Sequence, residues 1–180
     1  MAIMVSTRTL TRADLDALPD DGLRHELIDG HFVMTPAPGL NHQTISGALY
    51  RRLWSALQGT DLKVLTAPFD VILGSHVVKP DLVVAPESVY TPDDLPVPPL
   101  LVIEILSPST AHLDRGRKRD IYAEAGIPHY WIVDPNAPAV TVYELNDGTY
   151  AETAHASGDQ TLTVDHPIVL RLNPAKLLRR

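Results

Sequence analysis

Cysteine is absent from this chain, and that absence removes several classes of protein from consideration. Disulfide scaffolds, zinc sites with thiolate ligands and enzymes with a cysteine nucleophile are all excluded. The eight histidines form no metal-ligand cluster of the H-E-x-x-H kind. No G-x-x-x-x-G-K-[ST] segment is present either, so the sequence does not indicate a P-loop for nucleotides.

Long apolar runs are also lacking. No stretch approaches the roughly 18 apolar residues that a membrane helix requires. Near the start, the apolar run at 2–5 is too short for a secretory signal, and Arg8 and Arg12 follow it. We therefore expect a soluble, cytoplasmic protein with no membrane partner.

Positive charge and aromatic side chains are scarce. Fifteen Lys and Arg against 22 Asp and Glu give a net charge of −7, which argues against a protein that coats nucleic acid through bulk charge. Aromatic residues make up 6%, so no platform for stacking single-stranded bases is obvious. No helix-turn-helix or zinc finger is recognisable, although a locally basic groove is compatible with this composition.

What is present is an ordinary globular composition, with 44% hydrophobic and 21% charged residues in a length that suits one domain over 1–180. A strand–helix–strand unit between 100 and 134 implies a parallel pair with a right-handed crossover. The remaining segments suggest hairpins, so we expect an α/β (α+β) fold with a mixed β-sheet. The expected elements are a helix at 11–18, an N-terminal hairpin at 23–35 turning at Asp29-Gly30, a helix from Asn41 to about Leu57, β-rich runs at 62–73 and 77–85, a proline-rich loop at 86–99, a strand at 100–106, a helix at 114–126, a strand at 128–134, a C-terminal β-meander and a last helical turn at 174–178.

Glu104 stands in the middle of the strand at 100–106, which is otherwise entirely apolar. Strands of this kind are buried on both faces, and an ionised carboxylate there is costly unless it is paired or binds a metal. Strand alternation places Glu104 on one face with Val102 and Leu106. Taken alone, Glu104 is most simply explained as half of a buried ion pair with an arginine.

Asp81 is a second acid in an apolar segment, and it follows Pro80. Proline predicts a sheet edge or a bulge at this point, where side chains often point in a changed direction. A turn at the start of the strand is the simpler explanation of one Pro-Asp pair. Two carboxylates that converge at a sheet end make a site for a hard divalent cation. Glu26, in the hairpin, is a third candidate, and alone it is more simply an exposed residue or an ion-pair partner.

The helix after Glu104 carries the candidate cations. Asp114, Lys118 and Tyr122 recur every fourth residue and share one face, with Arg115 and Arg117 beside them. A solvated basic face explains this pattern simply. The functional alternative directs Lys118 toward the acids, where its charge would act on a phosphate.

His42 and Gln43 begin the helix that starts at Asn41. Free N–H groups at a helix N-terminus suit anions such as phosphate. A role for His42 as a simple cap or first-turn residue explains its position equally well.

Several motifs occur in a fixed order along the chain. They are HELIDG at 25–30, NHQ at 41–43, KPDLVV at 79–84, VIEILSPST at 102–110, then Asp114, Lys118, Tyr122 and AGIPHYWIVDP at 125–135. Together they resemble the Uma2 family of restriction-endonuclease-like proteins, within the PD-(D/E)xK nuclease superfamily. The resemblance runs over 24–135 and weakly to about Leu145, which gives a core of about 23–145.

The resemblance implies a restriction-endonuclease-like core, with the mixed sheet flanked by helices. It implies that Asp81 and Glu104 bind Mg²⁺ or Mn²⁺ together with the backbone carbonyl of Ile105, and that Glu26 joins through water or a second metal. The superfamily places its lysine two residues after the glutamate, where this chain has Leu106. In the closer family, Uma2, the lysine lies on the following helix. The resemblance therefore implies that Lys118 orients or activates the attacking water, or stabilises the phosphorane.

The implied activity is metal-dependent hydrolysis of nucleic acid, in the first place as a DNA endonuclease. The expected substrate contacts are His42, Gln43, Arg115, Arg117 and Tyr122. A homodimer is expected, because two cuts need two sites related by a two-fold axis.

Two alternatives remain open: a non-catalytic module that binds nucleic acid or protein and keeps the fold, and a hydrolase of another phosphoester. The presence of Glu26, Asp81, Glu104 and Lys118 together favours the active nuclease, since degenerate nucleases lose acids.

Overall fold

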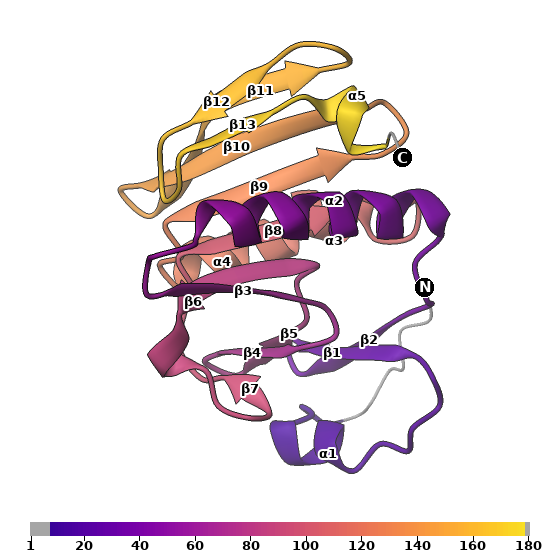
Figure 1. Ribbon diagram of the computed structural model, residues 1–180. Helices are drawn as coiled ribbons and strands as arrows, with labels where there is room; N and C mark the ends of the chain where they lie inside the picture. Colours follow the sequence, from indigo (N-terminus) through magenta and orange to yellow (C-terminus); the bar gives the residue numbers. More distant parts are fainter. Residues whose placement is uncertain (1–7, 179–180) are drawn as a thin grey trace.

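The computed structural model describes residues 8–178 as two β-sheets, a small two-stranded sheet and five α-helices within that range (Figure 1). The apolar run at 2–5 lies outside the described residues. Within 8–178, no helix is both long and apolar enough to span a bilayer.

The first sheet has the strand order β2-β1-β5-β4-β7. Its strands are β1 (Arg24–Ile28), β2 (His31–Thr35), β4 (Asp70–Leu73), β5 (His76–Val78) and β7 (Asp94–Leu95). The predicted hairpin is confirmed as antiparallel β1 and β2, and both turn residues have positive φ, 51° at Asp29 and 71° at Gly30. Helix α1 (Arg12–Asp16) packs Leu15 against the outer face of this sheet.

The second sheet has the order β11-β10-β9-β8-β6-β3, and β8 and β9 are its parallel pair. Helices α3 (Ala111–Arg115) and α4 (Arg117–Glu124) connect these two strands, so the predicted strand–helix–strand unit is confirmed. The C-terminal part adds the small sheet of β12 (Leu162–Val164) and β13 (Leu170–Leu172), and then α5 (Pro174–Leu177). The other strands of the second sheet are β3 (Leu62–Thr66), β6 (Leu82–Pro86), β8 (Leu101–Ile105), β9 (His129–Asp134), β10 (Ala139–Asn146) and β11 (Thr149–Ser157).

The structure corrects three of the predicted elements. The single strand expected at 77–85 is two strands, β5 in the first sheet and β6 in the second, because Pro80 has no N–H with which to continue a ladder. The helix expected at 114–126 is broken at Gly116, which adopts φ −113° and ψ −105° between α3 and α4. The loop at 86–99 contains a 3₁₀ turn (Glu87–Val89) and β7, which pairs in parallel with β4.

The two faces of β8 meet different parts of the core. Leu101, Ile103 and Ile105 pack in the cluster that includes the buried stripe of α2 (Leu40–Ala56), which Figure 1 shows lying across the second sheet. Val102 and Leu106 pack instead with α4 and residues of the first sheet. The alternation predicted for this strand is confirmed, and Glu104 therefore lies on the face that meets α4 and the first sheet.

Candidate active site

The pairing of β6 with β8 brings two of the predicted acids together. Leu82 pairs with Ile103 in an antiparallel register, and extending that register by one residue sets Asp81 opposite Glu104. The amide N–H of Ile105 donates to Asp81 Oδ2 at 2.8 Å. Glu104 is 1% exposed and Asp81 3% exposed, so both carboxylates lie in the interior.

The third acid, Glu26, reaches the same place from the first sheet. It is buried in β1, and its Oε1 accepts a hydrogen bond of 2.7 Å from the backbone N–H of Lys79. Lys118 Nζ lies 3.0 Å from Glu26 Oε1 and 2.9 Å from Glu104 Oε1. A single ammonium group therefore joins the carboxylates of the two sheets.

Lys118 is 2% exposed, which is rare for a lysine. Burial lowers the pKa of Lys118, but the charges of Glu104, Glu26 and Asp114 together outweigh burial and raise that pKa above its ordinary value. Asp114 Oδ1 lies 3.7 Å from the ammonium. The two side chains therefore lie on the same side, as their spacing of four residues predicts, although the helix is broken at Gly116.

The pKa of Glu104 is also strongly shifted by this environment. Burial raises its pKa to about 8, against the opposing effect of Lys118. The hydroxyl of Tyr122 donates to Glu104 Oε1 at 2.6 Å. Burial, followed by the charge of Glu104, raises the pKa of Tyr122, which keeps that hydroxyl a donor.

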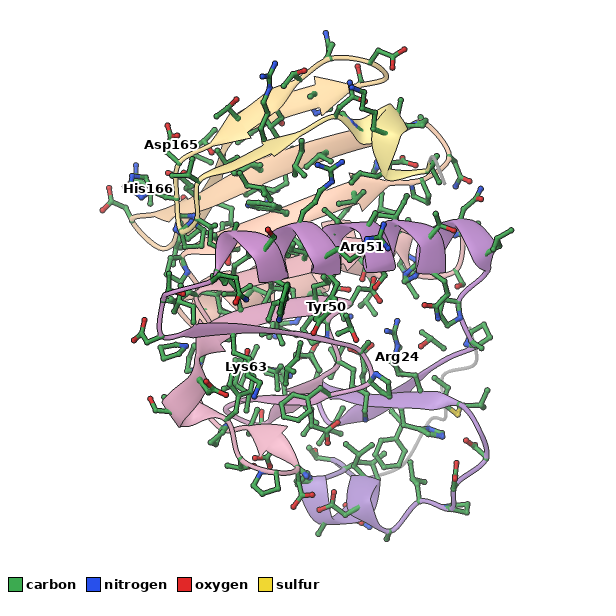
Figure 2. The ribbon with its side chains drawn as sticks, in the orientation of Figure 1. Arg24, Tyr50, Arg51, Lys63, Asp165 and His166 are labelled. Atoms are coloured by element: carbon green, nitrogen blue, oxygen red, sulfur yellow. The ribbon has the colours of Figure 1, made fainter. Side chains whose placement is uncertain are left out.

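Asp81 has a different set of partners. Arg24 Nη1 lies 3.0 Å from its Oδ1, and His42 Nε2 lies 3.0 Å from its Oδ2. Burial acts to raise the pKa of Asp81, but His42, Arg24 and the Ile105 amide outweigh burial, and the pKa is lowered. Figure 2 shows Arg24 extending from β1 toward the space beneath α2.

The cluster has more carboxyl groups than cationic groups. The acids Glu26, Asp81, Glu104 and Asp114 lie around two cations, Lys118 and Arg24. Carboxylate oxygens are the donors that a hard divalent cation prefers, and the charge of such a cation would favour the ionised form of Glu104. The donor chemistry therefore fits such a cation.

Within residues 8–178, however, no three side chains are arranged around one point as metal ligands would be. The cluster's own cations take up carboxylate oxygens, as the contacts of Lys118 and Arg24 show. Ile105 contacts Asp81 through its amide N–H, and the role implied for its carbonyl stays a prediction.

Three of the predicted substrate contacts do not line the pocket that contains Asp81. Arg115 lies 3.4 Å from Asp134, and Arg117 lies 2.7 Å from Asp29, in ion pairs near the surface. Tyr122 is fully buried inside the cluster as the donor to Glu104.

The other two predicted contacts, His42 and Gln43, lie beside the acids. Both line a pocket of about 250 Å³ that also includes Asp81 and Arg24 in its wall.

The prediction of site residues missed Arg24. It stands two residues before Glu26 in β1, so both side chains belong to the same face of the strand. An arginine at that spacing from a candidate acid was a usable signal. Its partner Asp81 could not be identified in this way, because Arg24 lies in the first sheet and Asp81 lies just before β6 of the second sheet.

Comparison with known proteins decides the family. A model of Uma2, described as "Putative restriction endonuclease", matches residues 12–175. The chain belongs to the Uma2 family. A crystal structure from Anabaena variabilis, described as a putative nuclease belonging to DUF820, matches this Uma2 protein with a TM-score of 0.74 at 20% identity, covering 94% of this chain and 97% of that one. The uncharacterized protein slr1290 of Synechocystis is 27% identical over 132 residues, which are 69% of this chain and 67% of that protein. The family assignment and the mixed α/β fold predicted from the sequence are thus confirmed, and both are consistent with a nuclease-like function.

Proposed function

We propose that this Uma2 protein is a metal-dependent nuclease that hydrolyses phosphodiester bonds in DNA. The observation that carries the proposal is the placement of Asp81 opposite Glu104 on adjacent strands, with the Lys118 ammonium 2.9 Å from Glu104. The description of the family as restriction endonucleases supports the same class of reaction.

In this proposal Asp81 and Glu104 hold Mg²⁺ or Mn²⁺, with the Ile105 carbonyl as a further ligand and Glu26 acting through water or a second ion. The surplus of carboxyl groups over cations in the cluster supports a divalent cation at this place. When bound, such a cation lowers the pKa of its water and neutralises the phosphate. Because Arg24 already contacts Asp81 Oδ1, the cation and the guanidinium compete for that oxygen.

Lys118 acts as a fixed positive charge in this scheme. Its raised pKa keeps it protonated at neutral pH, so it is not the base that takes a proton from the attacking water. Its ammonium instead orients that water and stabilises the negative charge that develops on the phosphate. Tyr122, buried against Glu104, positions that carboxylate and does not itself touch the substrate.

The partner in this proposal is DNA, and the active form is a homodimer, because cutting both strands requires two sites related by a two-fold axis. Light scattering with and without a DNA duplex measures the number of chains. A monomer in both conditions contradicts the dimer and leaves single-strand cleavage intact.

The test is cleavage of supercoiled and linear DNA with Mg²⁺ or Mn²⁺ by the wild type and by Asp81→Asn, Glu104→Gln and Lys118→Met. Each variant should lose activity on the order of 10²-fold or more. Glu87→Gln and Lys63→Met are matched controls, since Lys63 and Glu87 also lie 2.9 Å apart but on the surface, and both should cut like the wild type.

Three outcomes contradict the proposal in different parts. Cutting that survives Asp81→Asn and Glu104→Gln places the reaction elsewhere. RNA cleaved in preference to DNA contradicts the substrate. Absence of cutting with either metal, together with absence of Mn²⁺ binding by calorimetry, favours the non-catalytic module.

A further inference from the structure

The pocket beside Asp81 has two chemically different sides. Its volume is about 250 Å³, below the roughly 300–1,000 Å³ of pockets that hold drug-sized molecules. Pro36, Pro38 and Pro68 contribute apolar wall, while α2 contributes Gln43 and Ser46. A flat ring with polar atoms on its edge fits such a space.

Ser46 contributes a polar group to the wall of the pocket. It is 9% exposed, and its hydroxyl has no hydrogen-bond partner among residues 8–178. Its oxygen is not one of the fully buried side-chain atoms that lack a partner in the described residues, so it is open to the pocket, where a ligand can take the place of water. The Gln43 side chain also lacks a partner in the described part of the chain, and it lies three residues earlier on the same face of α2.

The net charge of the protein favours a ligand that brings few phosphate groups to the surface. Duplex DNA carries about one negative charge per 1.7 Å, and proteins that bind along it need rows of unpaired cations. This chain has a net charge of −7, and many of its cations are already held by acids. Those in ion pairs include Arg12, Arg24, Lys63, Lys79, Arg115, Arg117 and Lys118.

We propose that this pocket receives one unpaired nucleobase, from the nucleotide next to the phosphate that is cut. The proposed nuclease therefore cuts fastest where the nucleotide beside the cut phosphate is already unpaired, as in a single strand or a bulge. Enzymes that take a base out of the stack hold its faces between apolar side chains and bond to its edge. Here the prolines face the ring, and Gln43 and Ser46 meet the edge. This inference rests on the proposed function, since Asp81 in the pocket wall is one of the proposed metal ligands.

The first experiment compares three DNA substrates: a single strand, a duplex with a one-nucleotide bulge and a fully paired duplex. The wild type should cut the first two faster than the third by about tenfold or more, the order expected for holding one stacked base. Ser46→Leu, which fills the pocket, should remove that preference. Ser55→Leu is the matched control on the exposed face of the same helix and should retain it.

The second experiment measures binding without cleavage. Calorimetry with the four deoxynucleoside monophosphates should show binding to the wild type and to Ser55→Leu, with about tenfold weaker binding to Ser46→Leu. Gln43 is exposed, so Gln43→Ala should fold normally and should change the order of preference among the four bases. Thermal melting of each variant checks that it is folded.

The outcomes separate this inference from the proposed function. Mononucleotide binding that is lost in Ser46→Leu, with no cleavage of any substrate and no binding of Mn²⁺, supports the nucleobase pocket and refutes the nuclease. Cleavage that requires Asp81 but is equal on paired and unpaired DNA, and is unaffected by Ser46→Leu, supports the nuclease and overturns the pocket. Mononucleotides that bind equally to the wild type and Ser46→Leu also overturn it.

Discussion

Replacement of Lys118 by methionine tests whether the buried cluster depends on its central cation. The substitution keeps most of the side-chain length and removes the charge, leaving Glu26 and Glu104 buried without the ammonium that lies 3.0 and 2.9 Å from them. Removal of one partner from a buried ion pair costs about 3–5 kcal/mol. That is a large fraction of the roughly 5–15 kcal/mol by which domains are stable.

The cost depends on pH with a definite sign. Lys118 opposes the effect of burial on Glu104, so its removal raises the pKa of Glu104 further above its value of about 8. The folded variant then binds more protons than the unfolded chain, in which the carboxyl has its ordinary pKa of 4.5. Stability of the variant therefore falls as pH rises above that ordinary value, and the loss relative to wild type is smaller at pH 5.5 than at pH 8.5.

The assay is urea denaturation of metal-free protein at both pH values, with Lys63→Met as the control. Lys63 lies 2.9 Å from Glu87, almost the same distance, but both side chains are well exposed, and such pairs contribute about 0–1 kcal/mol. Adding Glu104→Gln to Lys118→Met should recover part of the loss at pH 8.5, because a glutamine holds no proton that the unfolded chain would release at that pH. A cost for Lys118→Met no larger than that of Lys63→Met would refute the reasoning.

Three further predictions concern neighbouring positions. Glu104→Gln in an otherwise wild-type, metal-free chain should flatten the decline of stability between about pH 5 and pH 8 that the raised pKa of Glu104 produces, measured by urea titration across that range. Gly116→Ala should cost about 1–3 kcal/mol of unfolding free energy, because its Cβ would lie 2.9 Å from the carbonyl oxygen of His112; unchanged stability would show that the backbone shifts freely there. Arg24→Gln should strengthen Mn²⁺ binding in calorimetry by removing the competitor for Asp81 Oδ1, and weaker binding would contradict that competition.

Local patterns in the sequence predicted the parts of the site that depend on one strand or one helix. The face of Glu104 followed from strand alternation, and the structure confirms it. Its simplest expected partner was an arginine, whereas the structure pairs it with Lys118, the residue that the alternative interpretation directed toward the acids. The spacing of Asp114, Lys118 and Tyr122 indicated one face of a helix, and all three side chains lie around Glu104 or its ammonium partner.

Features that depend on how distant segments meet were not predictable in the same way. The apolar pattern at 77–85 continues through Lys79, Pro80 and Asp81, so it gave no sign that the chain passes from one sheet to the other there. The burial of Glu26 follows from that crossing, because it sets β1 against the amide of Lys79. The break at Gly116 was hidden because the periodicity of side chains continues across it.

The bridging position of Lys118 makes the site part of what holds the two sheets together. Its ammonium joins Glu26 of the first sheet to Glu104 of the second, and Arg24 of the first sheet contacts Asp81 beside the second. Anything that binds these groups in the folded chain alone raises stability, by about 2.7 kcal/mol at a concentration 100 times its Kd. Resistance to heat therefore reports occupancy of the site without any turnover, and candidate cations and nucleotides can be ranked by the melting temperature they produce.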